Sequence, residues 1–548
     1  MPLNEFDVVV VGAGVNGMVA AAELAGAGRR VCLVEANERI GGFVASGELT
    51  VPGYVHDTFS SWHPLFLTGG AYAALGEALA RHGLEYRNTD DRLCASVAED
   101  GRTTMAYRDP ARTVEGFAHA GDRAAYLAML ERLGADIQAI GGLMGQELRS
   151  PAAVRSLLDL ARRNGLAGME QWARDTASSG RAAMERQFTG PEVDHLWAPW
   201  LLHGGLAPDS ASGGLMVALF AATMHGAGLP VVRGGAGRFV TAFEGLLAER
   251  EVEVRTGTVV DRVLVEDGRA VGVRAGESTL TAREAVLASV WPGVLYDQLL
   301  PVGAVRAGLR EEAVRYRPGR AAMQVHVALS GPVPWRDDEL AGVPLIHLSD
   351  GSSSTAIACA EASAGMLPAR PTVVVGQQHV LDPSRVPAGA AALWLQLQEV
   401  PFRPVGDSAG ELDVSSGWSP TLVDGYVDRV LHRIERQAPG LRERVLGVRA
   451  LSPVDLQAAN RNAVDGDPYE GSQELDQNLL WRPGPLTSRH RTEVPGLWHI
   501  GASTHPGAGL GAGSGHLVAQ EILRPPGLLS RLLPAGTAAR KLLASFRS

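Results

Sequence analysis

The chain has few cysteines and no excess of basic residues, and each shortage excludes a class of function. Only three cysteines occur among 548 residues, too scattered for a disulfide framework or a C-x-x-C metal or redox pair. The net charge of -10 argues against non-specific nucleic-acid binding, which needs basic surface to displace counterions from phosphates. The histidines show no ligand spacing, so we predict no metal site.

The first residues and the longest uncharged stretch predict neither export nor a membrane span. Glu5 and Asp7 precede the first apolar residues, and no basic segment with a cleavage site follows, so no signal peptide is predicted. The longest uncharged stretch, 210–232, is broken by glycines and a proline, and its apolar part, 215–224, is too short to span a bilayer. Residues 215–224 therefore predict a buried helix. Together with the few cysteines, these features predict a cytoplasmic protein.

A glycine-rich turn follows the first predicted strand. Residues 6–11 are a β-branched run typical of a strand buried in a parallel sheet, and residues 18–27 form an alanine-rich helix. Between them lies Gly12-Ala13-Gly14-Val15-Asn16-Gly17. In such a turn the first glycine permits the tight bend, the second lets the backbone approach a pyrophosphate, and the third lets helix and strand pack closely. The pattern predicts a dinucleotide-binding α/β domain.

An acidic residue and a second glycine turn follow. The predicted strand 30–35 ends in Glu35, 23 positions after Gly12, where an acid accepts the ribose hydroxyls and favours a free 2′-OH. These residues alone leave NAD open. After Ala36, the second turn, Glu38-Arg39-Ile40-Gly41-Gly42, favours FAD.

Two later segments extend this domain. The turn 234–237 leads to a predicted helix at 239–250, strands at 252–254 and 259–265, an Asp267-Gly268 hairpin turn and a strand at 285–288. Residues 496–511 again read as strand, glycine-rich turn and helix start. The spacing at 234–237 does not form a second dinucleotide motif, so we expect electrons to pass to a diffusible acceptor such as oxygen or a quinone, or to arrive from a carrier.

With these motifs the chain resembles the phytoene desaturase or phytoene dehydrogenase-like flavoproteins, which include retinol saturases and share a fold group with amine oxidases. The matching segments are 8–42, 52–57, 231–292, 382–389 and 497–523. The resemblance implies an α/β fold, with an FAD-binding two-dinucleotide-fold (Rossmann-like) domain and a discontinuous α+β substrate domain. We expect the FAD domain at 1–70, 230–298 and 486–523, and the substrate domain at 71–229 and 299–485.

The resemblance also implies which residues hold FAD. Glu35 would bind the adenosine ribose, and Val259 would contact adenine through its backbone. The remaining assignments are Arg39, Gly41 and Gly42 at the pyrophosphate, Ser60 and Ser61 near the flavin ring, and Gly501, Ala502, Leu510 and Gly511 at the ribityl and pyrimidine end.

Two departures from the wider fold group stand out. Its amine oxidases resemble one another in a lysine that holds water against flavin N5, but the only lysine here is Lys541, so rapid amine-oxidase-type reoxidation is not expected. Its covalent flavins are attached to a cysteine near the last glycine-rich turn, and no cysteine follows Cys359. The resemblance therefore implies non-covalent FAD.

The implied activity is that of a desaturase or dehydrogenase, which transfers hydride from a C–H bond of an apolar, isoprenoid-like or secondary-metabolite substrate to flavin N5. His63 and His505 are the candidate bases, with a structural role as the alternative for each. Reduction or isomerisation of a double bond on the same scaffold remains open. So does a non-enzymatic carrier of prenylated proteins, like the Rab escort proteins, although the intact glycine turn and Glu35 argue against it.

The other regions carry weaker signals. Residues 71–229 are rich in helical patterns, whereas 323–329 alternate as a strand suited to a sheet beneath the substrate. The tail 524–548 mixes arginines with leucines and has no acid, a composition that favours peripheral contact with an anionic membrane. Prolines interrupt it, so packing of its leucines on the protein or a partner subunit is the alternative.

Overall fold

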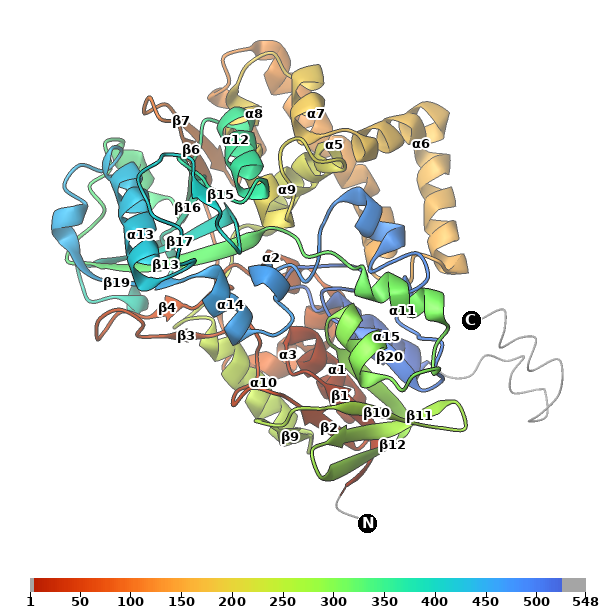
Figure 1. Cartoon of the computed structure of the whole chain (residues 1–548). Coiled ribbons are helices and arrows are strands. Elements are labelled where there is room, and N and C mark those ends of the chain that lie inside the picture. The colour runs from red at the N-terminus through yellow and green to blue at the C-terminus, as the bar shows by residue number, and fades with distance from the viewer. Residues whose placement is uncertain (1–3, 525–548) are drawn as a thin grey trace.

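The computed structural model describes residues 4–524. Its two large sheets occupy different regions, the first low in Figure 1 and the second at the upper left. Apart from Arg524, the C-terminal tail lies outside the described residues. Among residues 4–524, no helix is both long and apolar enough to cross a bilayer.

The first sheet has the strand order of a dinucleotide-binding fold. Its parallel strands follow the order β9-β2-β1-β12-β20, and the hairpin β10-β11 pairs with β12 in antiparallel fashion. The β-branched end of β1 is buried, as expected for a central parallel strand. The strands are β1 (Glu5–Val11), β2 (Val31–Val34), β9 (Glu253–Arg255), β10 (Arg262–Glu266), β11 (Arg269–Ala275), β12 (Ser278–Ser289) and β20 (Leu497–Ile500).

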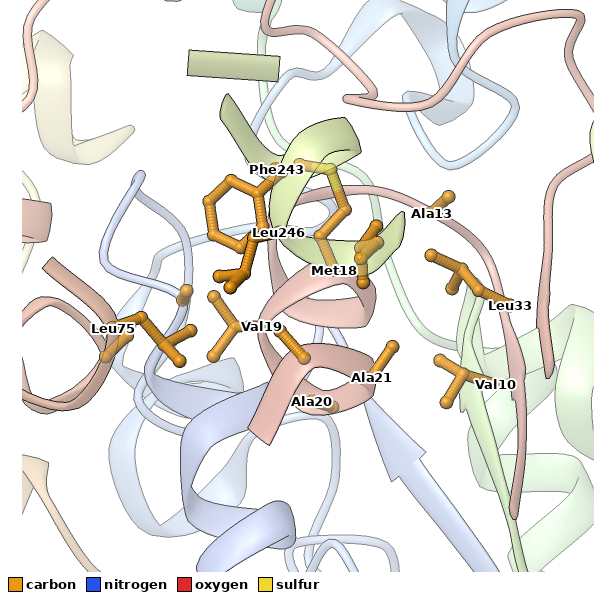
Figure 2. Packing of buried hydrophobic residues seen from close by; sticks show 14 of the residues in the cluster. Val10, Ala13, Met18, Val19, Ala20, Ala21, Leu33, Leu75, Phe243 and Leu246 are labelled. Atoms are coloured by element: carbon orange, nitrogen blue, oxygen red, sulfur yellow. The ribbon is translucent and has the colours of Figure 1, made fainter. Parts of the chain in front are cut away.

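Helices cover both faces of this sheet. One face packs on α1 (Val15–Gly26), α3 (Gly70–Arg81), α10 (Gly237–Glu249) and α15 (Gly513–Leu523). Figure 2 shows Met18 of α1 between Leu33 of β2 and Phe243 of α10, and Val19 of the same helix near Leu246 of α10. The opposite face packs on η2 (Val294–Leu299) and α11 (Ala307–Val314). The FAD-type α/β architecture expected from the sequence is thus confirmed.

The second sheet has seven strands in the order β19-β13-β17-β16-β14-β6-β7. Its outer face packs on α13 (Pro420–Glu435) through an apolar cluster. The strands are β6 (Arg92–Val97), β7 (Thr103–Tyr107), β13 (Ala321–Leu329), β14 (Leu345–Leu348), β16 (Val373–Gly376), β17 (Ala391–Val400) and β19 (Val445–Leu451).

The opposite side of β13 and β17 is called the inner face below. It consists of Ala322, Gln324, His326 and Ala328 of β13 with Ala392, Trp394, Gln396 and Gln398 of β17. Ala322 packs on Phe59, and Ala328 on Tyr54, so residues 54–59 lie against this face. Trp394 packs instead in a cluster with the helical layer.

The helical layer consists of α5 (Ala120–Met144), α6 (Pro151–Ala177), α7 (Gly180–Gln187), α8 (Glu192–Trp197), η1 (Pro199–Gly204) and α9 (Gly213–Ala227). The first two form the hairpin at the upper right of Figure 1. Shorter elements complete the chain: β3 (Ser46–Gly47), β4 (His56–Asp57), α2 (Pro64–Leu67), β5 (Tyr86–Arg87), α4 (Pro110–Glu115), β8 (Val231–Val232), η3 (Asp338–Gly342), α12 (Ser352–Ser363), β15 (Met366–Leu367), η4 (Gln378–Val380), η5 (Pro383–Arg385), β18 (Gly406–Asp407), η6 (Arg442–Arg444), α14 (Pro453–Ala459), η7 (Val464–Gly466), η8 (Leu475–Gln477) and η9 (Leu479–Trp481).

One predicted strand begins later than expected. The strand placed at 259–265 starts at Arg262, and Val259 lies in irregular chain with 45% of its surface exposed. The cause is upstream, because the backbone N–H groups of Gly257 and Thr258 donate to the carbonyls of Asn37 and Glu35. These bonds hold the segment at the end of β2. Val259 therefore lies next to Glu35 in space but outside the sheet.

Candidate functional site

Two glycines of the first turn admit no side chain. Gly12 has φ +94°, and a Cβ there would lie 2.8 Å from the carbonyl oxygen of Ser289 on β12. A Cβ on Gly17 would lie 1.9 Å from the carbonyl oxygen of Gly12. Both contacts are with backbone that cannot give way, so these glycines are required by the fold itself.

Gly14 differs because the space beside it is open. Its φ of -67° suits any residue, and a Cβ would meet no atom within 4 Å. It precedes α1, whose N-terminus has no side-chain cap and no acid in its first turn, Val15 and Asn16 included. Unpaired N–H groups and the helix dipole favour an anion at such an end. The open space at Gly14 is therefore suited to a phosphate.

Glu35 lies beside this turn. Its carboxylate accepts the N–H of Ala13 at 2.7 Å and the N–H of Asn37, the residue after Ala36, at 2.9 Å. The acid that follows β2 is thus held against the glycine-rich turn, the position expected of a ribose ligand. Its ribose contact stays a prediction.

The second turn closes over the first. Gly41 donates its N–H to the carbonyl of Ala13 at 2.8 Å, and a Cβ on Gly42 would lie 3.5 Å from Cα of Gly14. The guanidinium of Arg39 donates to the carbonyls of Gly42 and Val44 at 2.9 and 3.2 Å. Burial lowers the pKa of Arg39, while the charge of Glu35 opposes this. The pyrophosphate role of this turn stays a prediction, and its place beside Gly14 favours it.

The last glycine-rich turn meets the first at the carboxyl edge of the sheet. Gly515 of α15 has no room for a side chain, because a Cβ would lie 2.0 Å from the carbonyl oxygen of Asn16. Gly501 has φ +114° and donates to Ser514, and Gly511 packs near Leu65. Leu510 packs against the apolar cluster of the first sheet. The N-termini of α1 and α15 therefore converge.

Sequence reasoning missed Glu470 at this edge. One carboxylate oxygen of Glu470 accepts the N–H of Ala502 at 3.2 Å, and the carboxylate also interacts with Asn462, Arg482 and the backbone of Ser503. Burial raises the pKa of Glu470, although a hydrogen bond from Asn462 and the charge of Arg482 oppose the shift. The residue lies in an irregular stretch without a motif, so only the three-dimensional contacts reveal it.

A buried ionic network ties three distant segments together. Arg385 donates to Asp57 at 2.7 Å, to Asp382 at 3.2 Å and to the carbonyl of Val232 at 2.6 Å. Asp57 also accepts the N–H of Ala236, and Asp382 accepts that of Gly234. The segments 52–57 and 382–389, which match the family in sequence, are joined by this network.

The serines expected near the flavin ring extend from this network. Ser61 is buried; its hydroxyl donates to Asp57 and accepts from the side-chain amide of Gln378 at 3.0 Å. Ser60 remains partly exposed. The network thus fixes the 57–61 segment, whose contact with the ring stays a prediction.

The two candidate bases are both buried in protein contacts. His63 is fully buried; its Nδ1 lies 3.0 Å from the hydroxyl of Tyr86, its ring packs edge-on against Phe239, and burial lowers its pKa to about 3. His505 donates from Nε2 to the carbonyl of Leu143 at 3.1 Å, and burial lowers its pKa to about 4. These contacts favour a structural role for both.

Buried histidines make the protein sensitive to acid. Burial lowers the pKa of ten: His56, His63, His195, His203, His225, His326, His347, His379, His499 and His505. Below pH 6.5 each binds a proton in the unfolded chain but not in the folded protein, so the free energy of unfolding falls as the pH falls through this window. Each contributes a slope of up to about 1.4 kcal/mol per pH unit. Groups with a raised pKa act in the opposite sense but are fewer: Asp194, Glu399, Asp467, Glu470 and His490.

We therefore expect the Tm to fall steadily between pH 6.5 and about pH 4. Thermal unfolding across this range measures the slope. His225→Gln should make it shallower, since glutamine can still pair with Tyr126, which lies 2.8 Å from His225, but cannot titrate. A Tm that is constant or rises on acidification would contradict the lowered pKa values of these buried histidines.

Comparison with known proteins agrees with this geometry. Residues 16–389 match the family model described as flavin containing amine oxidoreductase. The chain is 25% identical to the mouse pyridine nucleotide-disulfide oxidoreductase domain-containing protein 2, over 95% of this chain and 94% of the relative. It is 28% identical to a phytoene dehydrogenase from Streptomyces griseus, over 97% of this chain and 98% of that relative. The crystal structure of an oxidoreductase from Methanosarcina mazei superposes with a TM-score of 0.61 at 15% identity, covering 94% of this chain and 99% of that one.

Proposed function

Because the chain belongs to the flavin-containing amine oxidoreductase family, we propose that it is a dehydrogenase that removes hydrogen from adjacent carbons of a substrate with an apolar body. It is an FAD-dependent oxidoreductase of the phytoene desaturase-like group. The remaining question is which bond it oxidises.

The residues at the edge of the first sheet fit FAD. The open space at Gly14, the uncapped end of α1 and the facing Gly42 suit the pyrophosphate, and the position of Glu35 beside this turn supports a role in binding the ribose. When bound, FAD supplies a ring that accepts hydride at N5. The protein's part is to fix the 57–61 segment through Arg385 and to keep water away from the reacting carbons.

The observation that carries the proposal is the absence of charge on the inner face. None of its eight side chains is ionised at neutral pH, since burial lowers the pKa of His326, its one titratable residue, to about 3. A protonated amine buried here would have no carboxylate to pair with, which is costly. The face therefore suits a neutral substrate better than the cationic substrate of an amine oxidase.

Aromatic side chains continue this uncharged surface. Trp394 on β17 packs in one cluster with Trp200 of η1, and Trp62 and Phe220 pack against that cluster while remaining partly exposed. Indole and phenyl rings offer large apolar area with few rotatable bonds. Such a surface can hold a hydrocarbon body in one orientation.

Anaerobic mixing tests the substrate class. The holoenzyme is combined with neutral isoprenoids of increasing length and, in parallel, with primary amines such as putrescine, and loss of the oxidised-flavin absorbance is followed. We expect reduction by members of the neutral series and none by the amines. Reduction by amines alone would refute the proposal.

A further prediction concerns how the flavin is attached. The three cysteines are all buried, and burial raises the pKa of each thiol, Cys32, Cys94 and Cys359, to about 12, so no reactive thiolate is available. Acid precipitation should therefore release all the FAD into solution. Yellow colour that stays with the precipitated polypeptide would show a covalent bond.

A further inference from the structure

Strand β13 is buried along its whole length, yet it alternates in polarity. Met323, Val325 and Val327 belong to the apolar cluster on the outer face. Gln324 and His326 point to the inner face and are just as buried. A strand buried on both faces normally reads as a continuous apolar run. The polar residues of the inner face therefore need another explanation.

Their polar atoms are largely without partners. Neither the amide nitrogen nor the oxygen of Gln324 has a hydrogen bond, although its side chain is fully buried. The same is true of Nδ1 of His326, Nε1 of Trp394 and Oε1 of Gln398. Gln396 stands directly opposite Gln324 in the sheet, and its exposed fraction is only 6%. Buried polar groups in folded proteins are nearly always paired, so such a concentration points to a missing partner.

The rest of the chain shows that buried glutamines here can be satisfied. Gln377 is equally buried, and its amide donates to the carbonyls of Leu340 and Val343 at 2.9 and 2.7 Å. Its oxygen accepts from the indole of Trp335 at 3.2 Å. Unpaired buried atoms also occur elsewhere in residues 4–524, but five of them gather on the two neighbouring strands of the inner face.

The unpaired atoms include both donors and acceptors. The amide nitrogen of Gln324 and the indole N–H of Trp394 are donors, whereas the oxygens of Gln324 and Gln398 accept. His326 donates from Nε2 to the carbonyl of Asp57 at 2.9 Å, which leaves Nδ1 as an acceptor. A neutral ligand group that both donates and accepts would complement them.

We propose that Gln324 and Gln396 form the recognition site for a neutral polar group of the substrate, a carboxamide, lactam or hydroxyl carried on its apolar body. This inference rests on the proposed function, because it assigns the inner face to the substrate. Its position supports it: Ala322 and His326, which flank Gln324 on this face, contact Phe59 and Asp57, next to the serines expected near the flavin ring. A polar group bound here lies beside the segment expected to border the flavin.

Unfolding measurements on the substrate-free holoenzyme provide the first test. Gln324→Leu removes unpaired polar atoms, so it should raise the Tm, by roughly 1–3 °C. Gln377→Leu is the matched control and should lower the Tm, because it strips three partners of their hydrogen bonds. A fall in Tm for both variants would show that Gln324 is satisfied in the free protein and would overturn the proposal.

Binding of small probes provides the second test. Benzamide, toluene and benzoate are titrated into the holoenzyme by calorimetry, with wild type, Gln324→Leu and Gln396→Leu compared for each probe. We expect each substitution to weaken benzamide about tenfold, as loss of a hydrogen bond does, and to leave toluene unchanged or tighter. Benzoate should bind more weakly than benzamide, because the face offers no charge partner.

Other outcomes would overturn the site. Benzamide that does not bind, or that binds wild type and both leucine variants equally, excludes it. A Gln324→Leu holoenzyme with an altered flavin spectrum and unchanged benzamide affinity would assign the orphaned atoms to the cofactor instead. These measurements involve no turnover, so their failure and failure of the proposed dehydrogenation can be told apart.

Discussion

Gly14→Val is expected to give a folded protein that no longer retains FAD. Its backbone conformation suits valine, and a Cβ would meet nothing within 4 Å, so the fold should tolerate the substitution. The isopropyl group would, however, occupy the space in which the pyrophosphate meets the end of α1. The flavin-to-protein ratio after purification measures the effect, with circular dichroism as the check on folding.

Gly134→Val is the matched control. Gly134 lies within α5 in the helical layer, and a Cβ there would also meet no atom within 4 Å. This variant should carry as much flavin as wild type. Stoichiometric flavin in Gly14→Val would mean that the cofactor does not lie where the first turn places it.

Arg385→Met is expected to cause the largest loss of stability. Arg385 is 2% exposed, and its removal leaves the buried carboxylates of Asp57 and Asp382 without a counter-charge. Burial opposes ionisation of Asp382, but hydrogen bonds from Ser384 and Gly234 and the charge of Arg385 lower its pKa, so it is charged at neutral pH. Breaking a buried pair of this kind costs about 3–5 kcal/mol.

Denaturant unfolding of the holoenzyme measures this loss, and flavin release should accompany it because the network holds the 57–61 segment. The control is Arg274→Met, which breaks the exposed pair between Arg274 and Asp261 at 2.6 Å and should cost less than about 1 kcal/mol. Equal effects of the two substitutions would show that the buried network is not what holds these segments together.

Local patterns predicted the strand, turn and helix framework of the first sheet well, because its signals are short in sequence. The β-branched run, the turn at 12–17 and Glu35 lie within one strand-helix-strand unit, and backbone sterics alone fix Gly12 and Gly17. The Asp267-Gly268 hairpin was predicted correctly for the same reason, since both residues have positive φ. The start of β10 was predicted too early, because hydrogen bonds from Gly257 and Thr258 to the carbonyls of Asn37 and Glu35 hold the preceding residues outside the sheet.

The substrate side could not be predicted in this way. Asp57 and Arg385 are 328 positions apart, and nothing in either segment identifies the other as its partner. The alternation at 323–329 predicted a strand, but that pattern normally indicates one solvated face, whereas here both faces are buried. Only the contacts of the fold show that the polar residues of this strand face the protein interior.

The most direct test of the central claim is anaerobic turnover with matched compounds that differ only in one carbon–carbon double bond. The saturated member of a pair should reduce the enzyme-bound flavin, and its product should have the mass of the unsaturated member. Pre-reduced enzyme should not be reoxidised by the unsaturated member at a comparable rate. If the saturated compounds leave the flavin oxidised while the unsaturated ones reoxidise the reduced enzyme, the protein is a double-bond reductase and the proposed dehydrogenation is wrong.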